Sequence, residues 1–154
     1  MNNFAFYSPT EFVFGKGTES QTAELVKKYK GTKVMIVYGG GSVVHSGLLD
    51  KVKKYLDEAG IAHVELGGIQ PNPTDPKVYE GIELGRREGI DFLLPVGGGS
   101  VIDTAKAIAM ALAVSMTEPP PTGSRKSIPS RRPSSIPSYT FGSVGLGWIP
   151  PSST

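Results

Sequence analysis

The sequence predicts an α/β fold built around a parallel β-sheet. Short apolar segments alternate with amphipathic helical segments over roughly the first 112 residues, and short loops join the two kinds of segment. Two of the apolar segments end alike, in three glycines and a serine that lead directly into a helical pattern. Strands and helices that alternate in this way form right-handed β-α-β units, which bring the carboxyl ends of the strands to one edge. We therefore expect a Rossmann-like sheet with a ligand crevice at that edge.

Hydrophobic periodicity and the positions of glycine and proline set the expected elements. Aromatic residues on both sides of Ser8-Pro9-Thr10 indicate a hairpin or edge ribbon that ends at Gly15-Lys16-Gly17. Strands are expected over residues 34–38, 62–66 and 91–96. Helices are expected over residues 18–29, 43–59, about 75–88 and 101–112.

The spacing of apolar residues predicts which side chains each helix buries. These are Ala23, Leu25, Val26 and Tyr29 in the first helix, then Val44, Leu48, Val52, Leu56, Val78, Ile82, Leu84, Val101, Ile102, Ala105, Ile108, Ala109 and Leu112. The helix over residues 101–112 is apolar on so much of its surface that we expect another part of a larger domain to cover it.

The most informative stretch is Gly97-Gly98-Gly99-Ser100, which follows an apolar strand and opens an alanine-rich helix. Consecutive glycines let the backbone approach an anion without obstruction by Cβ atoms. The first N–H groups of the helix and the helix dipole point to the same place, so we expect a phosphate group there. A compatible alternative is that the glycines only close the turn, with Ser100 capping the helix and Asp103 completing a capping box.

Two further loops are expected at the same edge of the sheet. Gly39-Gly40-Gly41-Ser42 follows the strand over residues 34–38, and the turn Pro71-Asn72-Pro73-Thr74 lies beyond the strand over residues 62–66. Three loops that converge on one crevice support a ligand site more strongly than any single run of glycines. The order of the strands cannot be derived from the sequence.

Composition excludes several classes of function. The chain has no cysteine, which excludes disulfides, thiol catalysis and cysteine-based metal sites, and it has two histidines, His45 and His63. No segment resembles a membrane span or a secretory leader, so we expect a cytoplasmic protein with no membrane partner. The net charge of +2 divides into +3 from Val114 onward and −1 before it. The nearly neutral first part has no basic stripe for nucleic acid.

Four motifs in order resemble those of one enzyme family. Residues 97–106, GGGSVIDTAK, match the GGGSxxDxAK signature of the iron-containing, or group III, alcohol dehydrogenases and of their glycerol dehydrogenase and dehydroquinate synthase relatives. The opening hairpin, Tyr38-Gly39-Gly40-Gly41-Ser42 and Gly68-Ile69-Gln70-Pro71-Asn72-Pro73 resemble the branch of NADPH-dependent butanol dehydrogenases and aldehyde reductases. The resemblance covers roughly residues 1–112 and implies a dehydroquinate synthase-like N-terminal domain.

The resemblance also implies which residues bind a dinucleotide cofactor. Those implied for the pyrophosphate are Gly97, Gly98, Gly99 and Ser100, those around the adenosine ribose are Gly39, Gly40, Gly41 and Ser42, and Asn72 and Asp103 belong to the same site. An NAD site generally has an acidic side chain that binds the ribose 2′-hydroxyl. The loop after residue 38 has no Asp or Glu, so we expect a preference for NADP(H), with NAD(H) as the alternative.

The composition changes after Leu112. Eight of the thirteen prolines lie from Pro119 onward, among serines and arginines and without helical or strand periodicity. Such a segment cannot bury enough apolar surface to offset its ordering entropy, so we expect it to be disordered. We interpret residues 1–113 as an incomplete nucleotide-binding domain and residues 114–154 as a tail from a truncated gene or a shifted reading frame.

In the family, a following helical domain supplies one Asp and three His to a catalytic Fe²⁺ or Zn²⁺, which polarises an alcohol or carbonyl oxygen for hydride transfer. These ligands cannot be assigned in this sequence, so we expect it to contain no catalytic residue, bind no metal and show negligible turnover. The resemblance implies that the intact enzyme interconverts primary alcohols and aldehydes and is a homodimer. The alternatives are a non-enzymatic nucleotide-binding module and a relative of glycerol dehydrogenase or dehydroquinate synthase.

Overall fold

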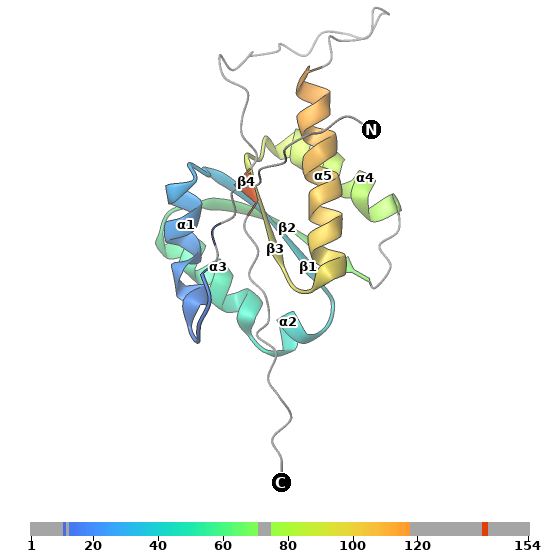
Figure 1. The fold of residues 1–154 in the computed structure, drawn as a ribbon. Coiled ribbons are helices and arrows are strands. Elements are labelled where there is room, and N and C mark those ends of the chain that lie inside the picture. Colours follow the sequence, from blue (N-terminus) through green and yellow to red (C-terminus); the bar gives the residue numbers. More distant parts are fainter. Residues whose placement is uncertain (1–10, 12, 71–74, 118–139, 142–154) are drawn as a thin grey trace, which may run out of the picture.

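The computed structural model describes residues 11, 13–70, 75–117 and 140–141 of the 154-residue chain. Strands and helices alternate along these residues, as the sequence predicts (Figure 1). In chain order the elements are η1 (Thr18–Gln21), α1 (Thr22–Lys28), β1 (Lys33–Gly39), α2 (Ser42–His45), α3 (Leu48–Glu58), β2 (Ala62–Ile69), α4 (Asp75–Glu88), β3 (Phe92–Val96), α5 (Gly99–Thr117) and β4 (Thr140–Phe141).

The strands form one parallel sheet in the order β2-β1-β3-β4. β1 lies between β2 and β3, with Val34 opposite both His63 and Phe92. Because all pairings are parallel, the carboxyl ends of β1, β2 and β3 meet at the same edge of the sheet. The fold class predicted from the alternation of segments is therefore confirmed.

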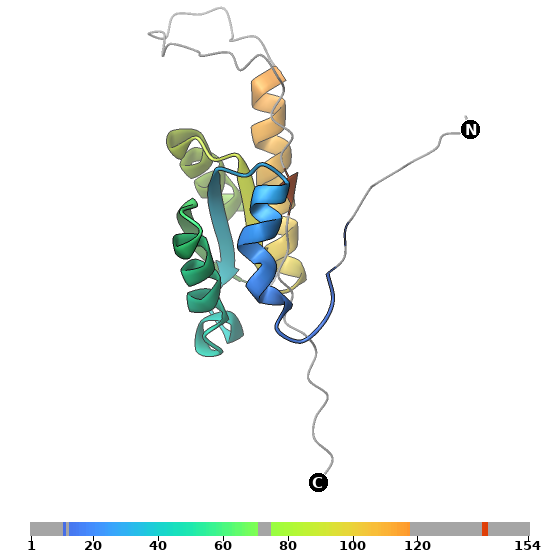
Figure 2. The same ribbon diagram turned by 90° about the vertical axis from the view of Figure 1, so that its left-hand side faces the viewer.

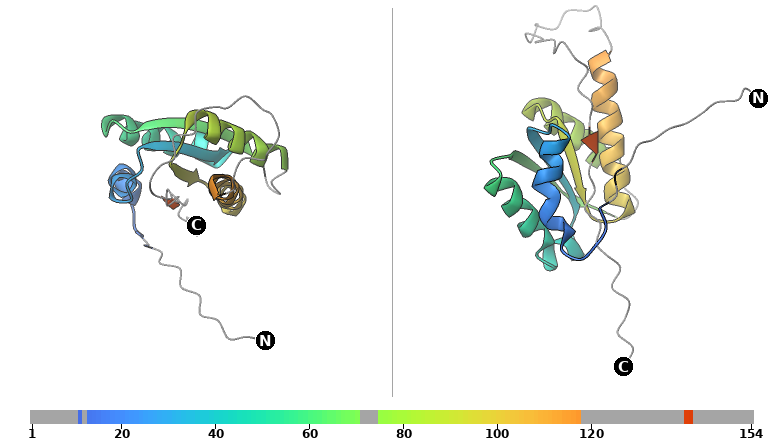
Figure 3. Two further views of the ribbon diagram at one scale, coloured as in Figure 1. Left: turned by 90° about the horizontal axis from the view of Figure 1, so that it is seen from above. Right: turned by 60° about the vertical axis from the view of Figure 1, so that its left-hand side comes forward.

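Helices cover both faces of the sheet, with α1, α2 and α3 on one face and α4 and α5 on the other (Figure 1). β1 supplies side chains to both layers. Val34 and Ile36 pack toward α1 and α3, Met35 and Val37 pack toward α5, and all four are 0% exposed. This arrangement explains why β1 is a continuous apolar run, since a strand covered on both faces has no polar side. Figure 3 (left) shows α1 and α5 end-on, on opposite sides of the strands.

The helix pair on the second face packs closely because α4 has two glycines on its inner side. A Cβ on Gly81 would overlap Ile108 Cδ1 and lie 2.8 Å from Leu66 Cδ2. A Cβ on Gly85 would lie 2.9 Å from Leu112 Cδ1. α4 therefore approaches α5 and β2 through its backbone, and the predicted inward residues Ile82, Ile108 and Leu112 fill the space around the contact.

A β-bulge near its carboxyl end makes β2 longer than predicted. Val37 pairs with Leu66 and Gly39 pairs with Ile69, so β2 has one more residue than β1 over this interval. Gly68 has a φ of +77°, a conformation that favours glycine. The expectation that the strand ends at Leu66 is wrong, because the bulge absorbs the two glycines and pairing continues to Ile69.

At the opposite edge, Asp91 connects the amino ends of β1 and β3. Its carboxylate accepts hydrogen bonds from the backbone N–H of Thr32 and of Lys33, each at 2.9 Å, and from the Thr32 hydroxyl. The Asp91 N–H donates to the Lys33 carbonyl. These contacts lie one or two residues ahead of the first β1–β3 pair, Val34 and Phe92, and fix the register of the two strands.

Several local expectations are wrong. The helix expected over residues 43–59 is two helices, because Gly47, with a φ of +71°, interrupts it between α2 and α3. Val44 consequently points outward and is 45% exposed, while Leu49 takes a core position. The first helix begins as the 3-10 turn η1, and Tyr29, expected to be buried, lies just beyond α1 and is 39% exposed.

The two ends of the predicted domain are described only in part. Most of the opening hairpin lies outside the described residues, and Val13 and Phe14 at its end are not in a strand. α5 continues past residue 112 to Thr117 and extends beyond the strands (Figure 2). The sequence indicated no strand in the tail, yet β4 pairs with β3 through Thr140 and Phe141. Among the described helices, none has the length and apolar character required to span a membrane.

Replacing Gly81 with valine tests the close α4–α5 contact. The added side chain must displace Ile108 and Leu66 in a packed core, so Gly81→Val should lower the free energy of unfolding by at least about 2 kcal/mol. Glu83→Val, at an exposed position of the same helix, is the matched control for helix propensity and should cost less than about 1 kcal/mol. Equal thermal or urea unfolding of the two variants would contradict the contact.

Candidate functional site

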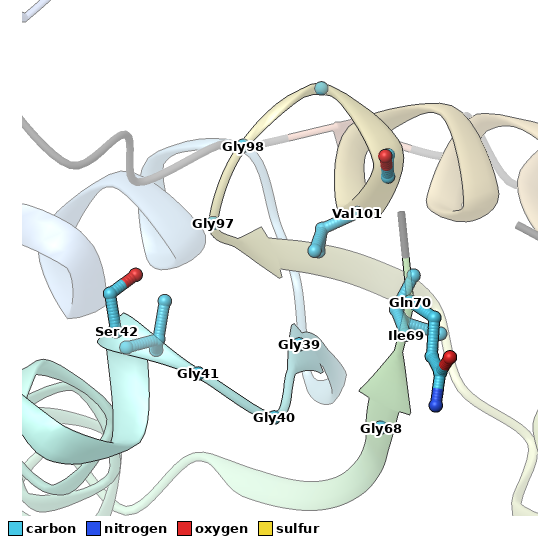
Figure 4. A pocket seen from close by; sticks show the side chains of 13 residues that line it. Gly39, Gly40, Gly41, Ser42, Gly68, Ile69, Gln70, Gly97, Gly98 and Val101 are labelled. Carbon is cyan, nitrogen blue, oxygen red and sulfur yellow. The ribbon is translucent and has the colours of Figure 1, made fainter. Parts of the chain in front are cut away.

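A cavity of about 400 Å³ lies at the carboxyl edge of the sheet. Three segments form its wall: the loop after β1, the end of β2, and the loop between β3 and α5 (Figure 4). The lining residues are Gly39, Gly40, Gly41, Ser42, Val43, Gly68, Ile69, Gln70, Gly97, Gly98, Gly99, Ser100 and Val101. Most of this wall is backbone, so a bound molecule would meet N–H and C=O groups more than side chains.

The loop after β3 places the start of α5 at the cavity wall. The Gly98 carbonyl accepts the N–H groups of Val101 and Ile102, both at 3.1 Å, and so occupies the N-cap position of α5. Because C=O and N–H point in opposite directions across a trans peptide, the Gly99 N–H points away from the helix. α5 extends from Gly99 to Thr117, and its dipole adds positive potential at this end.

This geometry contradicts the interpretation of Ser100 as a helix cap. Ser100 lies inside the first turn of α5, where its carbonyl accepts the Thr104 hydroxyl at 2.8 Å. Asp103 is therefore not the partner in a capping box, and it is exposed on the helix surface. Gly97 provides the sharp turn instead, with a φ of +153° and with Val101 Cγ2 only 2.9 Å from where its Cβ would stand.

The loop after β1 is held by a single carbonyl. Gly41 O accepts the N–H groups of Val44 at 3.1 Å and His45 at 3.3 Å, and His45 Nδ1 lies 2.9 Å from the same oxygen. Since a carbonyl only accepts, His45 Nδ1 carries the proton in this contact. His45, at the end of α2, thus orients the glycine loop.

The end of β2 forms the third wall, which the sequence analysis did not assign to the site. Gly68, Ile69 and Gln70 line the cavity, and Ile69 O lies 3.1 Å from where a Cβ on Gly39 would stand. The bulge brings them there, because the additional residue returns Ile69 to the face of the sheet that Leu66 occupies. Paired glycines within an apolar strand pattern were the available signal for this bulge.

The structure brings together eight of the ten residues predicted to contact a cofactor. These are Gly39, Gly40, Gly41, Ser42, Gly97, Gly98, Gly99 and Ser100. Asn72 lies outside the described residues. Asp103 is described and does not line the cavity. Val43 and Val101, which the sequence analysis considered only as core or helix positions, also line it.

A polar cluster connects β1, β2 and α3 just before the strands reach the cavity. Lys53 Nζ lies 2.8 Å from Glu65 Oε1, and the Tyr38 hydroxyl donates to Glu65 Oε2 at 3.0 Å. The hydrogen bond from Lys53 holds the pKa of the Glu65 carboxyl below its usual range, whereas burial and the bond to Glu65 raise the pKa of Tyr38. The Tyr38 ring lies over Gly67, where a Cβ would be 2.7 Å from Cζ. The cluster therefore fixes the strand ends just before the cavity.

The described residues do not provide a metal site. No three His, Asp or Glu side chains come close enough within them to hold an ion. His63 Nδ1 lies 3.6 Å from Asp57 Oδ1, and His45 contacts the Gly41 carbonyl.

Comparison with known protein families gives a match over most of the chain. The model of the iron-containing alcohol dehydrogenases matches residues 9–140, which is well over half of the chain. The chain belongs to the iron-containing alcohol dehydrogenase family. The resemblance stated from the four sequence motifs is thereby confirmed.

Individual relatives of the alcohol dehydrogenase family match the same region. The chain is 51% identical over 109 residues to the probable NADH-dependent butanol dehydrogenase 2 of Bacillus subtilis, covering 71% of this chain and 28% of that protein. It is 43% identical over 111 residues to the NADPH-dependent aldehyde reductase YqhD of Escherichia coli, covering 72% of this chain and 28% of that protein. The chain thus spans less than a third of the length of these relatives.

A solved structure agrees with the fold. The crystal structure of NADH-dependent butanol dehydrogenase A from Thermotoga maritima has 45% sequence identity and a TM-score of 0.66, over 71% of this chain and 27% of that one. The α/β arrangement described here is therefore that of one part of an iron-containing alcohol dehydrogenase.

Two glycine substitutions in one loop test the geometry of the turn. Gly97→Ala should lower the free energy of unfolding by about 1–3 kcal/mol, because alanine rarely adopts this φ and its Cβ would press on Val101. Gly98→Ala should change it by less than about 0.5 kcal/mol, because no atom lies within 4 Å of the added Cβ. Urea unfolding of both variants provides the comparison, and equal losses of stability would contradict this geometry of the turn.

Proposed function

We propose that the cavity binds a nicotinamide dinucleotide, with the pyrophosphate against Gly98, Gly99 and Ser100. The observation that carries this proposal is that two glycine loops, each ending a parallel strand and opening a helix, share one cavity. Ligands of open α/β sheets bind beyond the carboxyl ends of the strands. Free N–H groups at the start of a long helix favour a phosphate there.

Space at the glycines supports the fit of such a ligand. Cβ atoms built on Gly40, Gly41, Gly98 and Gly99 would meet nothing within 4 Å, so packing does not require glycine at these positions. All four residues line the cavity. Close approach of a ligand to the backbone gives glycine a purpose where the protein itself leaves room.

The dinucleotide, when bound, supplies the hydride that is exchanged with a substrate. The described residues bind and orient it: α5 and its loop hold the charged linker, and the loop held by His45 fixes a second contact. We further propose that the activity served is the interconversion of primary alcohols and aldehydes. The supporting relatives are named butanol dehydrogenases and an aldehyde reductase.

We also propose a preference for NADP(H) over NAD(H). Among the described residues that line the cavity, none is Asp or Glu, so none can accept both ribose hydroxyls as the acidic residue of NAD sites does. Gly39 has little room for such a side chain, because Ile69 O would lie 3.1 Å from its Cβ. Relatives named for NADH and for NADPH both match, so their names do not decide the preference.

Gly98→Ala tests binding separately from folding. The methyl group stands in open space at the cavity wall, so stability is retained while the approach of the pyrophosphate is obstructed. We expect the variant to bind NADPH at least about tenfold more weakly than the wild-type chain, equivalent to about 1.4 kcal/mol. Calorimetric or fluorescence titration of the full 154-residue chain measures this. Unchanged affinity in a folded variant would remove the proposed phosphate position.

The cofactor preference is measured by titrating the wild-type chain with both dinucleotides. A cavity wall without a carboxylate leaves the ribose 2′-hydroxyl of NADH without its usual partner and does not repel the 2′-phosphate of NADPH. The dissociation constant of NADPH should therefore be the smaller one, by about tenfold or more. Tighter binding of NADH would contradict the preference while leaving the dinucleotide site itself supported.

A further inference from the structure

We propose that Lys77, near the start of α4, supplies the positive charge that binds a phosphate of the dinucleotide in the cavity. This inference rests on the proposed dinucleotide function and adds a residue to the site. Lys77 does not belong to either glycine loop, and the sequence motifs gave no reason to select it. Its position next to the β2 bulge is what identifies it.

The cavity needs a cation that its wall does not provide. Within the described part of the chain, the lining residues are glycines, serines, valines, one isoleucine and one glutamine, and none carries a charge. NADH has two phosphate charges on its pyrophosphate, and NADPH has an additional phosphate on the ribose. Backbone N–H groups and the α5 dipole favour such charge only by partial charges. A formal positive charge within reach would therefore increase affinity.

The β2 bulge brings Lys77 next to the wall. Gly68 lines the cavity, and Cε and Nζ of Lys77 both lie 3.9 Å from where a Cβ on Gly68 would stand. Gly68 has a φ of +77°, which disfavours any residue with a side chain at this position. No side chain of residue 68 therefore stands between the Lys77 ammonium group and the strand. A lysine has a flexible four-carbon stem and three donors, so its ammonium group can turn from the strand end toward an anion in the cavity.

The present partner of Lys77 is one that a phosphate can replace. Lys77 Nζ lies 2.8 Å from Glu80 Oε2, one turn along the same helix, with side chains 33% and 56% exposed. A partly exposed pair within one helix contributes little net free energy because water and salt screen it. The dianionic charge of a phosphate monoester, or the two charges of a pyrophosphate, offers a stronger partner at the same place.

Titration of the full chain with NADPH and with NADH tests the role of Lys77. Lys77→Gln should weaken NADPH binding about fivefold, and Lys77→Arg, which retains the charge, should stay within about twofold of wild type. Equal weakening for NADH and NADPH would place Lys77 on the pyrophosphate. Weakening for NADPH alone would place it on the ribose 2′-phosphate. The affinity of Lys77→Gln should also depend less on NaCl than that of the wild type.

Lys54 provides the matched control. It also pairs with a glutamate of its own helix, Glu58 on α3 at 3.7 Å, and it is not among the described residues that line the cavity. Lys54→Gln should leave both affinities unchanged. If the wild-type chain binds a dinucleotide and Lys77→Gln binds both forms equally well, the inference is wrong although the proposed function stands. If the wild-type chain binds neither dinucleotide, the proposed function fails and the role of Lys77 fails with it.

Discussion

Parallel pairing of β1 with both of its neighbours is the constraint on which the rest of this structure depends. It brings the carboxyl ends of three strands to one edge, so that loops more than fifty residues apart in the sequence enclose one cavity. The same pairing leaves β1 covered on both faces, which requires side chains that are apolar on both sides. Asp91 reinforces the pairing at the opposite edge by binding the backbone just before β1 begins. The site is therefore a consequence of how the sheet is assembled.

Glycine residues serve two different purposes in this structure. In α4, glycine allows two helices and a strand to come closer than any side chain would permit, so its role is packing. In the loops, four glycines that line the cavity have nothing within 4 Å of the position of a Cβ atom, so packing does not account for them, whereas the proposed ligand site would. The distinction matters because both kinds look alike in the sequence. Only the surroundings of the missing Cβ atom separate them.

Much of this arrangement could be predicted from the sequence, and the failures have physical causes. The alternation of segments predicted β1, β3, α4 and the start of α5 to within a residue or two, and the paired glycine-serine loops predicted most of the cavity wall. The break at Gly47 was missed, because apolar spacing continues across it and only the positive φ reveals it. The bulge was missed because two consecutive glycines equally indicate a turn. Lys77 could not be found at all, since its proximity to Gly68 depends on that bulge.

The proposed dinucleotide site would account for a cavity lined by backbone at this edge of the sheet. A dinucleotide presents charged phosphates and ribose hydroxyls, which N–H groups recognise at short range, and the two glycine loops place backbone groups at the cavity wall. His45 and the capping carbonyl of α5 each fix one peptide plane, so the donors are oriented before a ligand arrives.

The central claim is that both loops act as one binding site, and an amide NMR titration of the ¹⁵N-labelled chain with NADPH tests it most directly. The account predicts that the amide signals of Gly40, Gly41, Gly98 and Gly99 shift together with a single dissociation constant. The signals of Gly60 and Gly89, at the opposite edge of the sheet, should stay in place. Shifts confined to one loop, or equal shifts at both edges, would contradict a shared site.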